Sequence, residues 1–187
     1  AGIMSASGEP PDRTALAAMQ QALIHRGPDG EGAHFAAGVG MVQTRLAVID
    51  LATGDQPFKL SDGTALVANA EIYNYLELKA AMPDTRFATA SDCEVPLHLY
   101  RSQGADFVDA LRGMYAIAIH DPASRRLVLA RDPFGIKPLY YAEGRFGLAF
   151  ASEPQALIAA GLVQPRVRAG AAVELLLDQG AAVTAID

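Results

Sequence analysis

An arginine inside an apolar stretch is the first candidate for chemistry in this sequence. Arg45 lies in VQTRLAVID (42–50), between residues that favour burial, so its guanidinium needs an anionic or carbonyl partner. It could grip a ligand carboxylate through two parallel hydrogen bonds, or it could form a structural ion pair, for which Asp50 is a candidate. Both interpretations stay open, and residue type alone favours the ion pair.

A polar pair after a second apolar stretch suggests a different chemistry. Asn69 and Ala70 follow ALVA (65–68). An asparagine amide beside a backbone N–H could donate two hydrogen bonds to an oxyanion, each worth roughly a hundredfold or more in rate. Asp92, just after a residue that can cap a helix, could hold an ammonium group. The alternatives are a satisfied strand end for Asn69 and a helix-dipole partner for Asp92, so neither residue is specific alone.

Composition limits the class of protein. The 187 residues are 51% apolar, which fits one compact domain with its own core. A net charge of -6 argues against nucleic acid and anionic membrane as partners. No apolar run is long enough to span a bilayer and no leader pattern is visible, so we expect a cytoplasmic protein. The single cysteine, Cys93, excludes an internal disulfide, and the histidines show no metal-ligand spacing with it, so we expect no metal site.

Periodicity and capping residues predict four helices. Apolar residues at helical spacing indicate a helix over 11–24, with Asp12 as its N-cap. Ser91 and Glu94 have the form of a capping box before a helix that reaches about Ser102. Shorter helices are predicted over 106–112 and 153–160, the latter with Gly161 after its end.

The strand-like segments predict a layered α+β architecture. Segments 39–51 and 64–72 are predicted as neighbouring strands with a turn at Asp62-Gly63. MYAIAIH (114–120), RLVLARD (126–132) and FGLAFAS (146–152) suggest an antiparallel meander. Blocks of helices and antiparallel strands, without βαβ alternation, argue against a doubly wound parallel sheet. We divide the chain into a domain over 1–165 and a segment over 166–187 that is either a C-terminal tail or the start of a link to a further domain.

Several sequence motifs, taken in their order along the chain, give a specific resemblance to a known family. The chain resembles the N-terminal glutaminase domain of glutamine-dependent asparagine synthetases in HRGPDGEG (25–32), TRLAVIDL (44–51), NAEIYNY (69–75), SDCEV (91–95), GMYAIAIHD (113–121) and ARDPFGIKPLYY (130–141). Related class II amidotransferase domains share the HRG element, whereas EIYNY with ARDPFGIKPLYY points to the asparagine synthetase branch. The resemblance implies an N-terminal-nucleophile fold, an αββα sandwich of two antiparallel sheets between helix layers.

The resemblance also implies an activity. Members of this family use an N-terminal cysteine whose thiolate attacks the side-chain amide of L-glutamine while its own α-amino group handles the proton. The products are glutamate and ammonia, and the ammonia passes to an ATP-dependent synthetase domain or subunit. ATP and Mg²⁺ are expected only in that synthetase part, and no cofactor is expected in this domain. The sequence leaves open whether the chain forms a homodimer.

The resemblance also implies roles for individual residues, wherever this sequence matches the family's site positions. Arg45 matches the residue that holds the glutamine α-carboxylate, and Glu71 and Asp92 match the acids that receive its α-amino group. Asn69 and the backbone N–H of Ala70 match the oxyanion donors. The same pocket is expected to be lined by Leu46, Ala47, Val48 and Ile49. Residues assigned to architecture rather than chemistry are His25 and Arg26 near the nucleophile strand, Asp132, Gly135 and Lys137 in a turn, and Cys93 in packing.

Two departures from the family pattern matter. Ala70 stands where the family has a glycine. The alanine keeps the backbone N–H, but its methyl group disfavours positive φ and could crowd the oxyanion pocket. Ala1 offers no nucleophile, so this chain is not expected to hydrolyse glutamine. Either Ala1 stands in the place of the cysteine, or AGI matches the second half of a CGIAGI opening and three residues are missing. The second placement suits the short distance to His25 better.

The two placements leave two hypotheses open. Under the second, the native protein is an active glutaminase. Under the first, the cysteine was mutated, or the domain is a natively non-catalytic glutamine-binding or structural partner of a synthetase, as in β-lactam synthetases.

Overall fold

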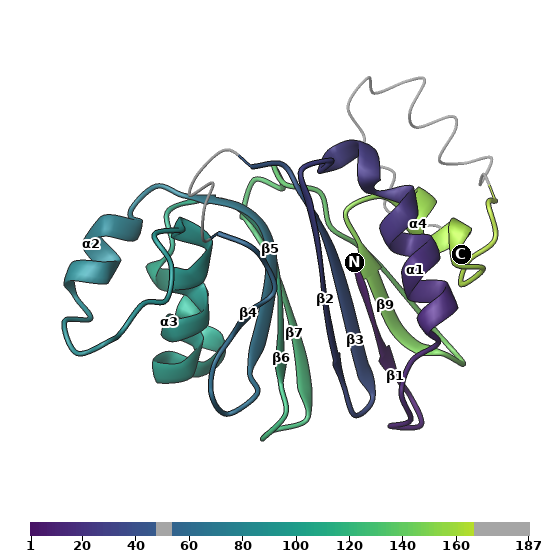
Figure 1. Cartoon of the computed structure of the whole chain (residues 1–187), viewed down its shortest axis with the longest axis horizontal. Helices are drawn as coiled ribbons and strands as arrows, with labels where there is room; N and C mark the ends of the chain where they lie inside the picture. The colour runs from purple at the N-terminus through teal and green to yellow at the C-terminus, as the bar shows by residue number, and fades with distance from the viewer. Residues whose placement is uncertain (48–53, 167–187) are drawn as a thin grey trace.

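The computed structural model of the chain describes residues 1–47 and 54–166. Nine strands in this part form two sheets that pack face to face (Figure 1). The first sheet has the order β2-β3-β1-β9-β8 and the second has the order β4-β5-β6-β7, and the paired strands in both are antiparallel. The first sheet contains β1 (Gly2–Ser5), β2 (Gly30–Ala36), β3 (Val39–Arg45), β8 (Tyr140–Gly144) and β9 (Gly147–Ala151). The second contains β4 (Phe58–Lys59), β5 (Ala65–Ile72), β6 (Gly113–Asp121) and β7 (Arg126–Arg131).

Helices cover the outer face of each sheet. Figure 1 shows α1 (Arg13–Ala22) and α4 (Pro154–Ala159) against the first sheet, and α2 (Tyr75–Ala80) and α3 (Val95–Gln103) on the side of the second. Short 3₁₀ turns complete the connections: η1 (Ile24–Arg26), η2 (Asp92–Glu94) and η3 (Gly104–Ala110). This arrangement confirms the αββα sandwich implied by the resemblance. No helix in the described part is long and apolar enough to cross a membrane.

The predicted helices are largely confirmed. Asp12 caps α1 by accepting a hydrogen bond from the N–H of Thr14 at 2.7 Å, and α4 ends before Gly161, whose φ is +70°. Ser91 caps η2, but Glu94 does not close the predicted capping box, because its carboxylate binds the preceding loop instead. The helix predicted over 106–112 is the 3₁₀ turn η3.

Two strand-pairing predictions are wrong. Strands β3 and β5 were predicted as neighbours but lie in different sheets, because β5 pairs with β4 and β6 while β3 pairs with β1 and β2. The predicted three-stranded meander is also divided, since β6 and β7 form a hairpin in the second sheet and β9 pairs with β1 and β8 in the first. Apolar periodicity identifies a strand but does not identify its partner.

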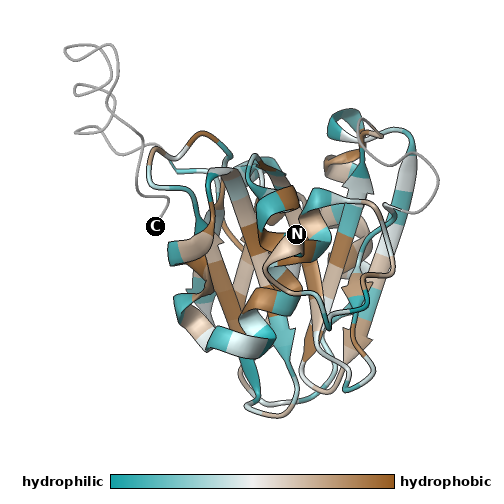
Figure 2. Cartoon of the chain, turned by 90° about the vertical axis from the view of Figure 1, so that its left-hand side faces the viewer, coloured by the Kyte–Doolittle hydropathy of each residue, from teal (hydrophilic) through white to brown (hydrophobic). Residues whose placement is uncertain are grey.

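Alternation along the strands divides the core into layers. In the first sheet, Ile3 and Val42 pack beneath α1, whereas Met4 and Met41 face the second sheet. The space between the sheets is filled by Val39, Met41, Ala65, Val67, Ala118 and Phe150. Figure 2 shows apolar residues concentrated on the strands, while the helices carry both polar and apolar residues. The two-residue period of a strand therefore decides which side chains can reach the space between the sheets.

A buried histidine pair joins the two sheets. His34 on β2 and His120 on β6 are 8% and 3% exposed, and His34 Nε2 lies 3.0 Å from His120 Nδ1. Burial, followed by the nearby charges of His120 and Lys59, lowers the pKa of His34 to about 4. Burial also lowers the pKa of His120, although Asp121 opposes the shift.

This pair predicts loss of stability in mild acid. Because the folded-state pKa of His34 lies below the ordinary value of 6.5, the unfolded state binds more protons between pH 6.5 and about 4. The stabilisation is complete above pH 6.5 and declines towards pH 4, by on the order of 3 kcal/mol. Urea unfolding at several pH values measures this slope. His34→Gln should flatten the slope relative to His25→Gln, which removes an exposed histidine, and identical slopes in both variants would contradict the assignment.

Candidate functional site

A pocket of about 440 Å³ opens between the two sheets, at the end of β1 where the chain begins. Strands β3 and β9 contribute from the first sheet, and β5 and β6 contribute from the second. Its walls include most of the residues that the resemblance selects, namely Ala1, Arg45, Leu46, Asn69, Ala70, Glu71 and Asp92. Arg26, Cys93 and Lys137, for which the sequence predicts other roles, line it as well, together with Gln56 and Ser152.

Strand β5 presents two hydrogen-bond donors in different directions. Asn69 follows Val67 on the face of β5 towards the other sheet. The backbone groups of Ala68 and Ile72 point away from β6, because Ala68 bonds the Gln56 side chain and the N–H of Ile72 donates to Asp92 at 2.8 Å. Since backbone N–H groups alternate along a strand, the N–H of Ala70 points to the same edge.

The methyl group of Ala70 is accommodated. Among the described residues, Arg125 is the one non-glycine residue with positive φ, so Ala70 has an ordinary extended backbone. Its side chain packs with the core beneath α3, on the opposite face from Asn69. The expected crowding of the oxyanion position by this methyl group is therefore not observed.

The two predicted ammonium ligands are 21 residues apart in the sequence but line the same pocket. Glu71 is on β5, with about half of its side chain exposed. Asp92 is buried at the start of η2, where Oδ2 accepts the N–H of Ile72. That bond ties η2 to β5 and brings both carboxylates to one pocket. Lys137 Nζ lies 3.3 Å from Glu71 Oε1, so the Glu71 carboxylate already forms an ion pair within the protein.

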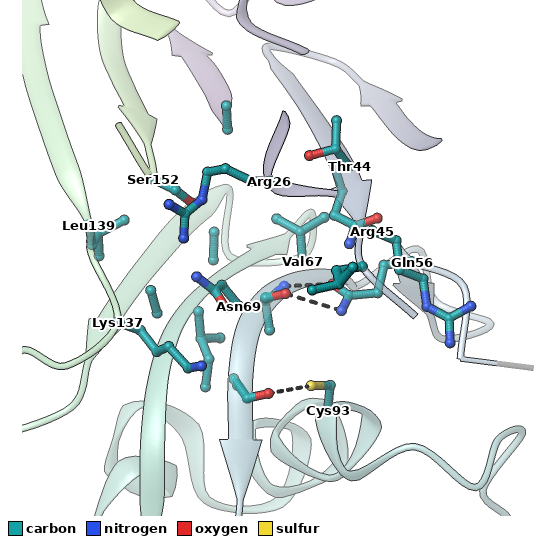
Figure 3. Close-up of a pocket in the computed structure, with 18 of the residues that line it drawn as sticks. Arg26, Thr44, Arg45, Gln56, Val67, Asn69, Cys93, Lys137, Leu139 and Ser152 are labelled. Atoms are coloured by element: carbon teal, nitrogen blue, oxygen red, sulfur yellow. Dashed lines mark hydrogen bonds between the residues drawn. The ribbon is translucent and has the colours of Figure 1, made fainter. Parts of the chain in front are cut away.

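Arg45 is buried and forms an ion pair. Its guanidinium donates to Asp55 Oδ1 at 2.6 Å, and Asp55 is largely exposed. Figure 3 shows the Arg45 side chain beside Gln56, pointing away from Asn69. The proposed sequence partner, Asp50, lies outside the described residues, so the structure supplies a different carboxylate for the ion-pair interpretation.

The remaining pocket residues of the same segment are only partly described. Leu46 lines the pocket and is 59% exposed, while the N–H of Ala47 donates to Asp29 in the HRGPDG loop at 2.9 Å. Val48 and Ile49 lie outside the described residues.

Ala1 continues the ladder of β1. It exchanges two backbone hydrogen bonds with Val42, at 2.9 and 2.8 Å. Burial lowers the pKa of its α-amino group to about 5, so an amine at this depth is neutral at pH 7. The methyl group of Ala1 packs with Ile3 and Val42 on the helix side of the sheet, away from the face that carries Asn69.

The HRG loop and the ARDPFGIKPLYY segment mainly provide structure. Arg26 Nη1 and His25 Nε2 contact Glu153 Oε1 at 2.8 and 3.2 Å, which ties the loop to the start of α4. Arg26 also lines the pocket, and Figure 3 places it on the same side as Asn69 and Lys137. Arg26 therefore connects the HRG loop with both the pocket wall and the start of α4.

The turn prediction for Asp132, Gly135 and Lys137 is confirmed. Burial alone would raise the pKa of Asp132, but the N–H groups of Lys137, Ile136 and Tyr115 lower it. Gly135 has a φ of +62°. The side chain of Lys137 also reaches the pocket. The sequence did not predict this contact, because the turn motif around Lys137 indicates only its backbone conformation.

Cys93 packs as predicted. Its side chain is buried, and Sγ donates to the carbonyl oxygen of Ala70 at 3.5 Å. Burial, followed by the charge of Asp92, raises the pKa of its thiol. Cys93 therefore lacks the thiolate that a nucleophile needs. Within residues 1–47 and 54–166, no three His, Cys, Asp or Glu side chains gather as metal ligands would.

Comparisons with known proteins agree with this geometry. The sequence model of the glutamine amidotransferase domain matches residues 1–185. This chain belongs to the glutamine amidotransferase domain family. It is 48% identical over 143 residues to asparagine synthetase [glutamine-hydrolyzing] 2 of Bacillus subtilis, covering 76% of this chain and 19% of that protein. It is 43% identical over 147 residues to the corresponding enzyme 2 of Oryza sativa subsp. japonica, covering 78% and 25%.

These relatives identify the branch of the family. The amidotransferase domain is of the type found in glutamine-hydrolysing asparagine synthetases, as the resemblance indicated. The chain spans only about a fifth to a quarter of the length of these curated relatives.

Solved structures confirm the fold of the domain. The chain superposes on glutamine phosphoribosylpyrophosphate amidotransferase from B. subtilis with a TM-score of 0.66 at 23% identity, covering 86% of this chain and 43% of that one. A structure of the allosteric regulatory enzyme of purine biosynthesis gives a TM-score of 0.69 at 22% identity, with the same coverage.

Proposed function

We propose that this amidotransferase domain binds L-glutamine in the pocket between the sheets and, with a cysteine on β1, hydrolyses it to glutamate and ammonia. The ammonia would serve an ATP-dependent amide synthetase, which would bind ATP and Mg²⁺ itself. The observation that carries the proposal is the convergence of Asn69, Glu71 and Asp92 on one pocket at the end of β1. Their chemistry matches an amide carbonyl and an α-ammonium group on one ligand.

The hydrogen-bond donors on β5 could stabilise the transition state of the reaction as well as bind the ligand. An oxyanion that forms from the glutamine amide could accept hydrogen bonds from the Asn69 side chain and the Ala70 N–H. The ammonium group would lie by Glu71 and Asp92, and the α-carboxylate would bind Arg45 after exchange with Asp55. Because Asp55 is 80% exposed, its pair with Arg45 is readily replaced.

Strand register supports one placement of the nucleophile. Gly2 pairs with Met41, and Ala1 pairs with Val42. If this register continued towards the N-terminus, the third residue before Ala1 would lie opposite Arg45. Residues two apart share a face, so that third residue would lie on the face of Met4, towards Asn69. A cysteine in the place of Ala1 would point towards the helices. The register therefore supports the CGIAGI alignment, under which the native protein is an active glutaminase.

Calorimetric titration tests glutamine recognition by the chain. We expect L-glutamine to bind, and Glu71→Gln to weaken binding by about tenfold to a hundredfold, because one charged hydrogen bond is worth roughly 1.5–3 kcal/mol. Glu77→Gln, on the exposed surface of α2, is the matched control and should bind like the parent chain. Absence of binding heat in the parent chain, with the fold intact, would contradict the proposed function.

A further inference from the structure

We propose that Lys137 competes with the α-ammonium group of the amino-acid substrate for Glu71, and thereby sets the affinity and the release of the ligand. The inference rests on the proposed function, because it concerns the ammonium end of the same glutamine pocket. It assigns an affinity-determining role to a residue that the sequence placed only in a turn.

The backbone of Lys137 is fixed from both sides. Its N–H donates to the buried carboxylate of Asp132 at 3.0 Å, beside the N–H of Ile136 at 2.9 Å. Its carbonyl oxygen accepts from Arg131 Nε at 2.8 Å, while Arg131 Nη2 donates to the Gly135 carbonyl at 2.7 Å. These bonds do not involve the Lys137 side chain. The loop therefore holds the lysine in place, whatever its ammonium group contacts.

The side chain extends from this fixed point into the pocket. It is 19% exposed, and Nζ lies 3.3 Å from Glu71 Oε1. Figure 3 shows its amine directed into the pocket below Asn69. Its positive charge also lowers the pKa of the Cys93 thiol, against the larger opposing effects of burial and Asp92. The ammonium group thus acts on the same small region that contains Glu71 and Asp92.

The geometry favours competition over support of Glu71. A charge-assisted hydrogen bond is ordinarily 2.7–2.9 Å long, so the contact at 3.3 Å fixes Glu71 only weakly. Half of the Glu71 side chain is exposed, so its carboxylate keeps solvent as well as Lys137. A second ammonium group that approaches Glu71 is repelled by the first. Binding of the substrate therefore requires Lys137 to give up part or all of this contact.

Replacement of the lysine tests the direction of the effect. In calorimetric titrations, Lys137→Met should lower the Kd for L-glutamine roughly two- to fivefold, because a partly exposed ion pair is worth up to about 1 kcal/mol. Lys137→Arg keeps the charge and should stay within about twofold of the parent chain. Lys59→Met on β4, outside the pocket, is the matched control. The desamino analogue 5-amino-5-oxopentanoate, which has no ammonium group, should bind the parent and Lys137→Met equally.

Lysine side-chain NMR provides a second readout. The chain has three lysines, Lys59, Lys79 and Lys137, so their Cε and Nζ signals can be assigned by substitution. On addition of L-glutamine, the Lys137 signals should shift towards those of a mobile, unpaired lysine, and the signals of the other two should stay in place.

The outcomes separate this inference from the proposed function. If the parent chain binds glutamine while Lys137→Met binds it more weakly or equally, Lys137 supports Glu71 or is neutral, and competition is wrong. Unchanged Lys137 signals at saturation would contradict it too. If the parent chain does not bind glutamine at all, the proposed function itself fails.

Discussion

Addition of Cys-Gly-Ile before Ala1 is expected to produce a glutaminase, whereas Ala1→Cys is not. The extended chain should release ammonia from L-glutamine at least about 10⁴-fold faster than the Ala1→Cys chain, because loss of a nucleophile removes most of the catalysis of a covalent mechanism. Steady-state ammonia release at pH 8, after removal of the initiator methionine, measures the difference.

The expected difference comes from the face of β1 that each cysteine occupies. A cysteine in the place of Ala1 would lie with Ile3 and Val42 beneath α1, where apolar surroundings raise a thiol pKa. The cysteine of the extension, three residues before Ala1, would lie on the opposite face of the sheet, towards the pocket that Asn69 lines. A Ser-Gly-Ile extension is the matched control and should remain at background. Equal rates for the extended and Ala1→Cys chains would contradict the register.

Asn69→Ala in the extended chain is expected to reduce kcat by about 10²- to 10³-fold. Loss of one oxyanion donor has effects of this size because the donor acts on charge that develops in the transition state. KM should change little, since Glu71, Asp92 and Arg45 are retained.

Ala70→Gly serves as the control for the same strand. It retains the backbone N–H and removes a methyl group that packs beneath α3, so kcat should stay within a few-fold. If Asn69→Ala lowered KM and kcat in proportion, or left kcat unchanged, Asn69 would not be an oxyanion donor.

Much of this site could be predicted from sequence motifs and from their order along the chain. The strand ALVANAEI and the caps at Asp12 and Ser91 follow from periodicity and turn chemistry, which act over a few residues. The pairing of β9 with β1, and the separation of β3 from β5, could not be predicted in this way. These pairings join residues far apart in the sequence, such as Gly2 with Phe150 in β1 and β9, Gly2 with Met41 in β1 and β3, and Leu66 with Ile119 in β5 and β6.

Side-chain partners were harder to predict than backbone elements. Arg45 was expected to need an anion, and the structure supplies Asp55. Lys137 reaches Glu71, 66 residues earlier in the chain, only because Asp132 and Arg131 fold its loop over the end of β5. Gln56 carries no motif, yet its amide satisfies both backbone groups of Ala68 at the edge of the site. Such contacts exist only once two sheets have packed.

Covalent labelling tests the central claim most directly. The extended chain would be incubated with a glutamine analogue that carries a diazoketone in place of the side-chain amide, and digested for mass spectrometry. The account predicts one adduct, on the added cysteine, and protection of that cysteine by L-glutamine, while buried Cys93 stays unmodified. An unmodified added cysteine, or an adduct on Cys93 instead, would show that glutamine does not bind where Asn69, Glu71 and Asp92 converge.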